Sequence, residues 1–111
     1  MATKKKNFII EQFKSYKVFL YGGGAAGLSS GVIHLSLPSG KAILRFRDGR
    51  LKKNKATVNG KNSTYEVYIK ADRYLAFIDL LRNEKPLYFF YDLKGNVAYI
   101  TTSDEPVGEN E

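Results

Sequence analysis

The sequence predicts an α+β fold: a single domain with a curved antiparallel β-sheet of about five or six strands and one main α-helix, at about residues 73–83, packed on one face. Apolar and polar residues alternate along several short segments, which is the period of strands with one buried face. A later segment has helical spacing instead and ends before Pro86. The length of 111 residues suffices for one core, so we expect one domain over residues 8–102.

The start of the chain predicts a tail followed by the first strand. Residues 1–7 are mostly basic and polar, and we expect them to be disordered. Residues 8–16 contain apolar residues at both helical and strand spacings, so the sequence leaves their structure open. Residues 17–21 alternate as a strand. Its outward face carries Lys17, Phe19 and Tyr21.

The middle of the chain predicts a β-hairpin. Residues 32–37 and 41–47 alternate cleanly on either side of Pro38-Ser39-Gly40, whose composition is typical of a turn. If Leu37 lies opposite Ala42, apolar residues face apolar residues, and a slip by one residue would mix the two faces. The same register predicts four further pairs: Leu35 with Leu44, Ile33 with Phe46, His34 with Arg45, and Val32 with Arg47.

The next region predicts one more strand and the helix. Residues 48–62 form a polar, basic connection that has room for a short strand around residues 56–58. Residues 64–70 alternate, with three residues inward: Tyr65, Val67 and Ile69. Asp72 is a suitable N-cap for the helix. The apolar stripe of the helix comprises Tyr74, Leu75, Phe77, Ile78, Leu80 and Leu81.

The last region predicts a second hairpin and a tail. Residues 87–91 and 97–102 are apolar and aromatic, and the segment Asp92–Asn96 between them has the composition of a turn. Residues 103–111 contain four acidic residues and no basic one, so we expect a disordered acidic tail.

The charge of the chain is concentrated in its first part. The formal net charge is +7, but residues 1–70 contain 14 basic and three acidic residues, whereas residues 71–111 contain four basic and eight acidic ones. The basic residues are densest between Lys41 and Lys61. Such a field attracts polyanions such as nucleic acid or an anionic membrane surface, although a solvated basic surface also keeps a protein soluble.

A glycine-rich run, residues 21–31, has two interpretations. Gly22, Gly24 and Gly27 have the G-x-G-x-x-G spacing, and Asp48 lies near the place of a ribose-binding acid. The run resembles the dinucleotide-binding turn of flavin- and nicotinamide-dependent oxidoreductases. This resemblance implies a cofactor, a helix after the third glycine and a second strand buried on both faces.

The residues after the glycine run favour a different interpretation. Residues 32–37 have the period of a strand rather than of a helix. Arg45 and Arg47 lie in the strand that a dinucleotide-binding fold would bury. The run is therefore interpreted as a loop between two antiparallel strands.

The outward face of the sheet is the candidate site. Cations neutralise phosphates and aromatic rings stack on bases, so a face that interleaves them suits single-stranded DNA or RNA. The predicted nucleic-acid-binding residues are Lys17, Phe19, Tyr21, His34, Arg45, Arg47, Arg50, Lys52, Lys53, Tyr68 and Lys70. The order of four strands and a helix is similar to that of small single-strand-binding transcription factors of the Whirly and Pur-alpha kinds.

A protein-interaction role is the alternative to nucleic-acid binding. Apolar and polar residues also alternate in any antiparallel sheet that has one solvent-exposed face. A cross-strand pair between an arginine and Glu66 would then have only a structural role. Phe19 and Ile43 on the outward face, or Phe77 in the broad apolar helix, would suit an interface between copies. We therefore expect a homodimer or higher homo-oligomer. In it the outward face of the sheet either binds nucleic acid or forms the contact between copies.

The sequence gives little indication of catalysis. His34 is the only histidine and the chain has no cysteine, so a multi-histidine or thiolate metal site is excluded. The acidic residues are scattered along the chain. We expect no enzymatic activity, no cofactor and no metal. No apolar run approaches the ~20 residues that a membrane helix needs, so we expect no membrane partner. We expect a cytoplasmic location, because the chain has no cysteine and the apolar run near its start is too short for a signal-peptide core.

Overall fold

Two β-sheets and one helix make up the fold in the computed structural model, which describes residues 7–20 and 31–103. The five-stranded sheet has the strand order β2-β3-β4-β6-β5, and the three-stranded sheet has the order β1-β7-β8. The strands are β1 (Phe8–Phe13), β2 (Tyr16–Leu20), β3 (Gly31–Leu37), β4 (Gly40–Arg47), β5 (Lys55–Thr57), β6 (Ser63–Lys70), β7 (Leu87–Asp92) and β8 (Val97–Thr102). The predicted α+β class is confirmed, but the strands are divided between two sheets.

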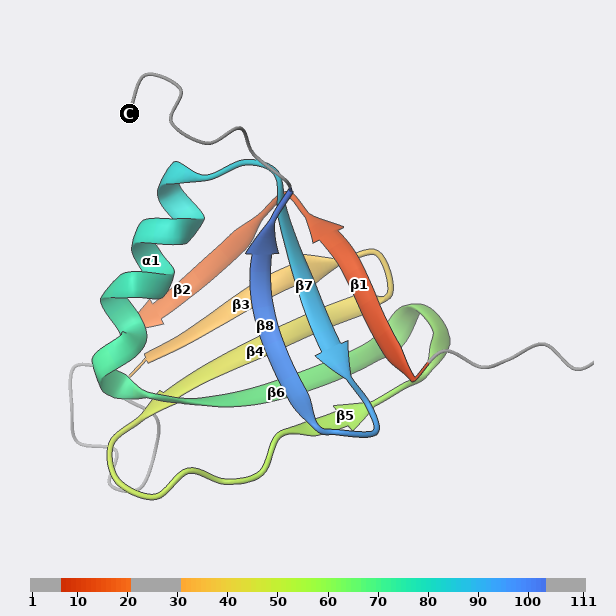
Figure 1. The fold of residues 1–111 in the computed structure, drawn as a ribbon, viewed down its shortest axis with the longest axis horizontal. Coiled ribbons are helices and arrows are strands. Elements are labelled where there is room, and N and C mark those ends of the chain that lie inside the picture. Colours follow the sequence, from red (N-terminus) through yellow and green to blue (C-terminus); the bar gives the residue numbers. More distant parts are fainter. Residues whose placement is uncertain (1–6, 21–30, 104–111) are drawn as a thin grey trace, which may run out of the picture.

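The two sheets pack face to face, and the strands of the three-stranded sheet cross those of the five-stranded sheet at a steep angle (Figure 1). Rings join the two layers, because the centroid of Tyr65 in β6 lies 5.8 Å from that of Phe89 and 5.5 Å from that of Tyr91 in β7. The buried core side chains are Phe13, Ile33, Leu35, Leu37, Ala42, Leu44, Phe46, Tyr65, Val67, Ile69, Leu81, Leu87, Phe89 and Tyr91. The last hairpin forms a second layer because a helix of 10 residues covers only part of the apolar face of the larger sheet.

Residues 8–16, whose structure the sequence left open, are largely extended. β1 pairs with β7 and β2 pairs with β3, so the chain passes from one sheet to the other between Phe13 and Tyr16. The Ser36 N–H donates to the Ser15 carbonyl oxygen (3.2 Å) at this corner. One continuous segment thus ties the two layers together.

The turn between β3 and β4 is shorter than predicted, so the register of the hairpin differs. Leu37 pairs with Gly40 rather than with Ala42, so every predicted pair is shifted by two residues. A shift of two residues keeps each side chain on its own face, so the alternation could not distinguish the two registers. Gly40 permits the turn, because its φ is +145° and a Cβ there would overlap the Ser63 carbonyl oxygen.

The strand β6 runs parallel to β4, whereas an antiparallel sheet was predicted. The connection between them contains β5 and a 3₁₀ turn (Gly60–Asn62), and it is long enough to return the chain to the start of β4. β5 pairs antiparallel with the other side of β6, close to the strand predicted around residues 56–58. The predicted inward residues of β6 are buried, which confirms its facing.

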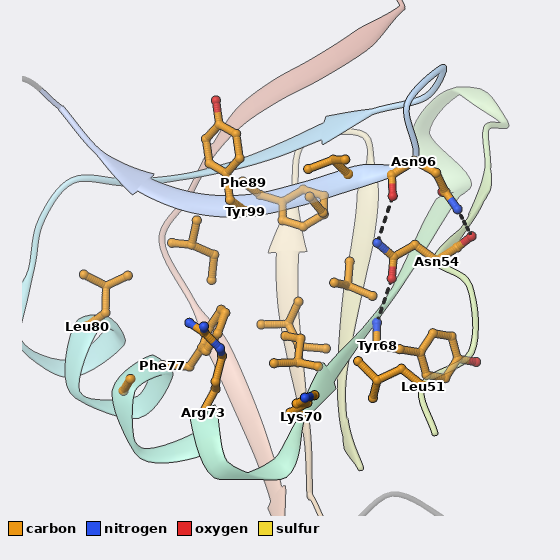
Figure 2. Close-up of a pocket in the computed structure, with 17 residues that line it drawn as sticks. Leu51, Asn54, Tyr68, Lys70, Arg73, Phe77, Leu80, Phe89, Asn96 and Tyr99 are labelled. Atoms are coloured by element: carbon orange, nitrogen blue, oxygen red, sulfur yellow. Dashed lines mark hydrogen bonds between the residues drawn. The ribbon is translucent and has the colours of Figure 1, made fainter. Parts of the chain in front are cut away.

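Two asparagines link the β4–β5 connection to the turn between β7 and β8 (Figure 2). Asn54 Nδ2 donates to the Asn96 carbonyl oxygen (3.1 Å), and Asn96 Nδ2 donates to the Asn54 carbonyl oxygen (2.8 Å). Asn54 Oδ1 also accepts a bond from the Tyr68 N–H (2.9 Å). These bonds hold the two sheets together at one end.

The helix α1 (Tyr74–Asn83) follows a 3₁₀ turn (Ala71–Arg73) and lies beside the three-stranded sheet (Figure 1). It packs on the inner side of the larger sheet. The ring centroids of Tyr74 and Phe77 lie 5.1 Å and 5.4 Å from that of Phe46 in β4.

Two predictions about the helix are wrong. Asp72 does not cap it, because the 3₁₀ turn places Arg73 at the N-cap position, where no side chain makes a capping bond. Leu75 is 76% exposed, so the apolar stripe is narrower than predicted. Phe77 is partly buried and packs against the core at Phe46. Among the described residues, no helix is long and apolar enough to cross a membrane.

The chain around the glycine run has strands where the dinucleotide fingerprint implies a helix. β2 and β3 are antiparallel neighbours with Leu20 opposite Gly31, and residues 31–37 are extended. Residues 21–30 of the run, which include the predicted site residue Tyr21, lie outside the described residues, and Gly31 begins β3. The two predicted tails also lie outside them, apart from Asn7 and Ser103.

Candidate nucleic-acid interface

The face of the five-stranded sheet that points away from the three-stranded sheet carries most of the predicted site. We call it the basic face. Its charged and aromatic residues are Lys17, Phe19, His34, Lys41, Arg45, Arg47, Lys55, Glu66, Tyr68 and Lys70. Side chains of alternate residues share a face of a sheet, so the period-two pattern of each strand places these residues together. Seven of the eleven predicted site residues belong to this face.

The register across the sheet arranges the basic face in rows. One row crosses all five strands and contains Lys17, His34, Ile43, Glu66 and Lys55. A second row contains Phe19, Val32, Arg45 and Tyr68. Neighbouring strands lie about 4.8 Å apart, so side chains within a row are close enough to interact. Four segments that are separate in the sequence therefore contribute to one surface.

An aromatic and cationic cluster lies at the β2 side of the basic face. The Phe19 and His34 rings have their centroids 4.9 Å apart and are tilted by 53°. The Lys17 Nζ lies 5.2 Å from the centroid of the Phe19 ring, which is a cation–π distance. Phe19 and His34 are half-buried, so each presents part of its ring to solvent. These contacts hold a ring in place beside a positive charge.

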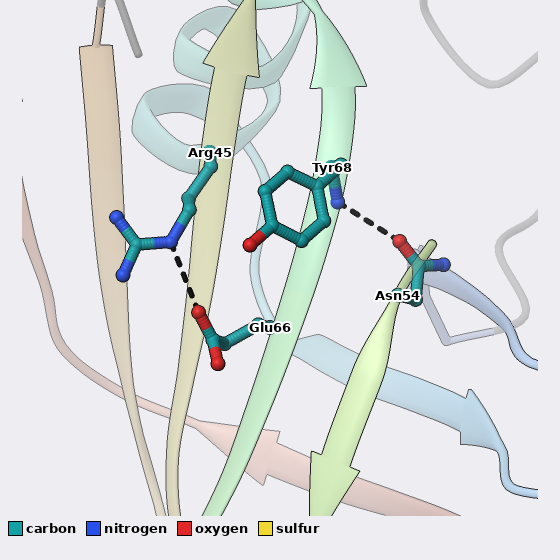
Figure 3. Close-up of polar contacts among 4 residues, drawn as sticks. All are labelled: Arg45, Asn54, Glu66 and Tyr68. Atoms are coloured by element: carbon teal, nitrogen blue, oxygen red, sulfur yellow. Dashed lines mark hydrogen bonds and ion pairs between the residues drawn. The ribbon is translucent and has the colours of Figure 1, made fainter. Parts of the chain in front are cut away.

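An ion pair lies near the middle of the basic face. Arg45 Nε donates to Glu66 Oε1 at 3.2 Å, which confirms that Glu66 pairs with an arginine across strands. Figure 3 shows the two terminal guanidinium nitrogens pointing away from Glu66, and the Tyr68 ring beside the pair. Glu66 is the only acidic side chain that the described part of the chain places on this face. The face thus stays strongly positive.

The electrostatics of the basic face act on its one histidine. Burial lowers the pKa of His34 below its ordinary value of 6.5, and the positive charges of Lys41, Arg45 and Lys17 lower it further. Imidazole is neutral at pH 7 under these conditions. His34 is therefore a reporter of the positive field, because it is the only histidine in the sequence.

Four predicted residues do not belong to the basic face. Arg50, Lys52 and Lys53 are exposed in the connection between β4 and β5, off the sheet, and Tyr21 lies outside the described residues. Two residues that are not among the predicted binding residues also belong to the face. Lys41, opposite Ser36, has the outward facing that alternation predicts, and Lys55 was not predicted. The alternation in Lys55-Ala56-Thr57 was the available signal for the latter. Ile43 is buried within the chain and does not need a partner to cover it.

The outer face of the three-stranded sheet is a second surface, which the sequence did not predict. We call it the aromatic face, and its members are Phe8, Ile10, Tyr88, Phe90, Val97 and Tyr99. Phe8 and Phe90 stack at 5.4 Å, and Phe90 and Tyr99 stack at 4.5 Å. Phe8, Ile10, Val97 and Tyr99 are 40%, 51%, 54% and 48% exposed. A partly exposed row of rings therefore crosses all three strands, and Asp92, between Phe8 and Val97, is the charged residue that the register places on this face.

Within the described ranges, no group of three or more His, Cys, Asp or Glu side chains is placed to hold a metal ion. No family model matches the chain, and neither a curated protein nor a solved structure gives a significant match.

Proposed function

We propose that this chain is a non-enzymatic binding module that holds single-stranded nucleic acid on its basic face. The observation that carries the proposal is the basic face itself, where four strands align cations and aromatic rings around one acidic residue. A nucleic-acid partner is met inside the cell, so the proposal includes a cytoplasmic location.

The mutual repulsion of the cations supports a polyanionic ligand. Lys17, Lys41 and Arg45 lie close enough to lower the pKa of His34. A chain of phosphates would relieve this repulsion and release its own condensed counterions, which favours binding most at low salt. A membrane surface would offer the same charges. It would not stack flat on the exposed ring faces as an unpaired base does.

The rings on the basic face support a single strand rather than a duplex. Phe19 and Tyr68 are half-buried and lie in the same row as Arg45. Stacking on an unpaired base contributes about 1–3 kcal/mol per ring, and a duplex keeps the faces of its bases inside. A single strand would therefore use both components of the face.

Nuclear magnetic resonance mapping with a short oligothymidylate tests the proposal. We expect amide shifts in β2, β3, β4 and β6 at the residues of the basic face, and unchanged shifts in α1 and on the aromatic face. Shifts confined to another surface, or none at high protein concentration, would contradict it. Replacing the exposed Lys17 and Lys41 by alanine is expected to weaken binding about tenfold or more, since each contributes phosphate contacts.

A matched control separates the face from the total charge. Lys85 and Lys94 are also exposed, but they lie before β7 and in the turn between β7 and β8. Replacing this second pair by alanine removes the same charge and is expected to change the affinity much less. Equal losses from the two pairs would mean that net charge, and not the basic face, attracts the oligonucleotide.

Self-association is a second candidate function, and the aromatic face favours it. This face contains no basic residue, whereas a chain of net charge +7 repels its own copy at the basic face. Two copies related by a twofold axis would bury the same largely apolar patch on each side. We expect sedimentation velocity to detect a dimer, and Ile10→Lys to convert it to a monomer with an unchanged fold. A monomer at high concentration would contradict this candidate.

A further inference from the structure

An open pocket of about 680 Å³ lies between the two sheets and the helix (Figure 2). Its walls come from β6, from the end strand β8 and from α1. The apolar interior includes Val67, Ile69, Phe77, Phe89 and Ile100, and the polar lining includes Lys70 and Arg73.

The strand pairing explains why the space is open. β8 ends its sheet, and β5 pairs only with Thr64–Glu66 of β6, so the rest of β6 has no strand on the side away from β4. Two alanines, Ala76 in the helix and Ala98 in β8, line the gap with short side chains. The two sheets therefore diverge on this side instead of closing over the core.

The polar groups at the inner end of the pocket are already bonded within the protein. Asn54 and Asn96 bond to each other's carbonyl oxygens, and Asn54 Oδ1 accepts from the Tyr68 N–H. Asn96 Oδ1 accepts from the Tyr91 hydroxyl. These groups therefore have no free hydrogen-bonding capacity in these bonds for a ligand to use. The rest of the interior is aliphatic and aromatic. The interior therefore suits an apolar body and disfavours a nucleic-acid base, whose polar edge would lose its hydrogen bonds to water.

Two cations lie where β6 gives way to the helix. Lys70 is the last residue of β6 and Arg73 is the N-cap residue of α1, and both line the pocket and are exposed. Figure 2 shows Arg73 and Phe77 next to each other at the helix side of the pocket. Within residues 7–20 and 31–103, neither cation forms an ion pair or a side-chain hydrogen bond. Both cations are available to an anionic group at the mouth.

We propose that this pocket binds an amphipathic anion, a molecule with an apolar body and one carboxylate, sulfonate or phosphate head group. The apolar body lies between the sheets against Phe89 and Ile100, and the head group lies at Lys70 and Arg73. The volume is within the range of about 300–1,000 Å³ that is typical of small-molecule sites. Lys70 also belongs to the basic face, but Arg73 does not, so a variant at Arg73 tests this pocket separately from nucleic-acid binding.

Dodecanoate, below its micellar concentration, is the probe for this site, and dodecanol is the neutral control. We expect isothermal titration calorimetry to detect dodecanoate binding, and methyl resonances of Val67, Ala98 and Ile100 to shift. Arg73→Gln is expected to weaken dodecanoate binding about tenfold, because a charge-assisted bond is lost, while dodecanol binding stays the same. Arg82→Gln is the matched control, since Arg82 is an exposed arginine of the same helix that does not line the pocket.

Three outcomes would overturn the proposal. They are no binding of dodecanoate, methyl shifts on the aromatic face at Ile10 instead of in the pocket, and equal affinities of the Arg73→Gln and Arg82→Gln variants. Ala98→Phe fills the pocket and is expected to abolish binding of both probes, and its amide spectrum checks that the fold is kept. Oligonucleotide binding is measured on the Arg73→Gln variant too, and we expect it to be unchanged, so the two proposals can fail separately.

Discussion

Glu66→Gln is expected to increase the affinity for single-stranded nucleic acid. Glu66 is the one acidic residue that the described chain places on the basic face, in an ion pair with Arg45 and opposite Lys55. Glutamine has the same size and keeps an oxygen that accepts from Arg45 Nε. The substitution therefore removes a negative charge from the face while the local packing is preserved.

The size of the gain follows from Coulomb's law. One phosphate at roughly 7 Å from the carboxylate is repelled by about 0.6 kcal/mol in a medium with the dielectric constant of water. Phosphates further along the strand add less, because salt screens charges beyond roughly 10 Å. A total of about 1 kcal/mol corresponds to a roughly fivefold increase in affinity at low salt. Release of Arg45 to contact a phosphate would steepen the log–log salt slope by about 0.7.

Fluorescence anisotropy with a labelled oligothymidylate measures this gain. Glu84→Gln is the matched control, because it removes the same charge at the end of the helix, away from the basic face. We expect the gain for Glu66→Gln alone, with a loss of stability of no more than about 1 kcal/mol for the partly exposed ion pair. An affinity equal to or below that of the wild type, or an equal gain from both variants, would refute the reasoning.

Three further predictions concern the histidine, the hairpin turn and the core. The lowered pKa of His34 means that the unfolded chain takes up a proton near pH 6.5 that the folded chain does not. Stability to urea should therefore decrease as pH falls through about 6.5, His34→Gln should flatten this dependence, and bound oligonucleotide should raise the His34 pKa measured by nuclear magnetic resonance. Gly40→Ala should destabilise the fold by more than about 1 kcal/mol in chemical denaturation, because its Cβ would overlap the Ser63 carbonyl. Phe46→Ala should cost about 3–5 kcal/mol and Leu75→Ala less than about 0.5 kcal/mol, and similar values for the two would contradict the packing of the helix.

The facing of side chains was predictable from the sequence, because alternation fixes which residues share a face. Ile33, Leu35 and Phe46 are all buried, and Lys17 and Arg45 share the opposite face, as predicted. Alternation does not specify partners or exact register. Three features therefore could not be predicted from the sequence. They are the shift of the β3–β4 hairpin by two residues, the parallel pairing of β6 with β4 and the division into two sheets.

The candidate site was predictable only where it depends on a single sheet face. The cluster of Lys17, Phe19 and His34 comes from adjacent strands, so a period-two pattern was enough to find it. The aromatic face requires β1 to lie beside β7, and these strands are separated by most of the chain. The pocket requires β6, α1 and β8 to diverge on one side, which depends on pairing that local patterns do not encode.

Titration of the wild-type chain with a labelled oligothymidylate at two salt concentrations tests nucleic-acid binding most directly. If about four cations of the basic face contact phosphates, the log–log slope for a single strand is roughly −2.8, and affinity falls about 50-fold between about 50 and 200 mM salt. We expect roughly micromolar binding at the lower salt and this steep loss at the higher. Absence of binding at the lower salt, or equal affinity at both, would contradict the assignment of the basic face as a nucleic-acid interface.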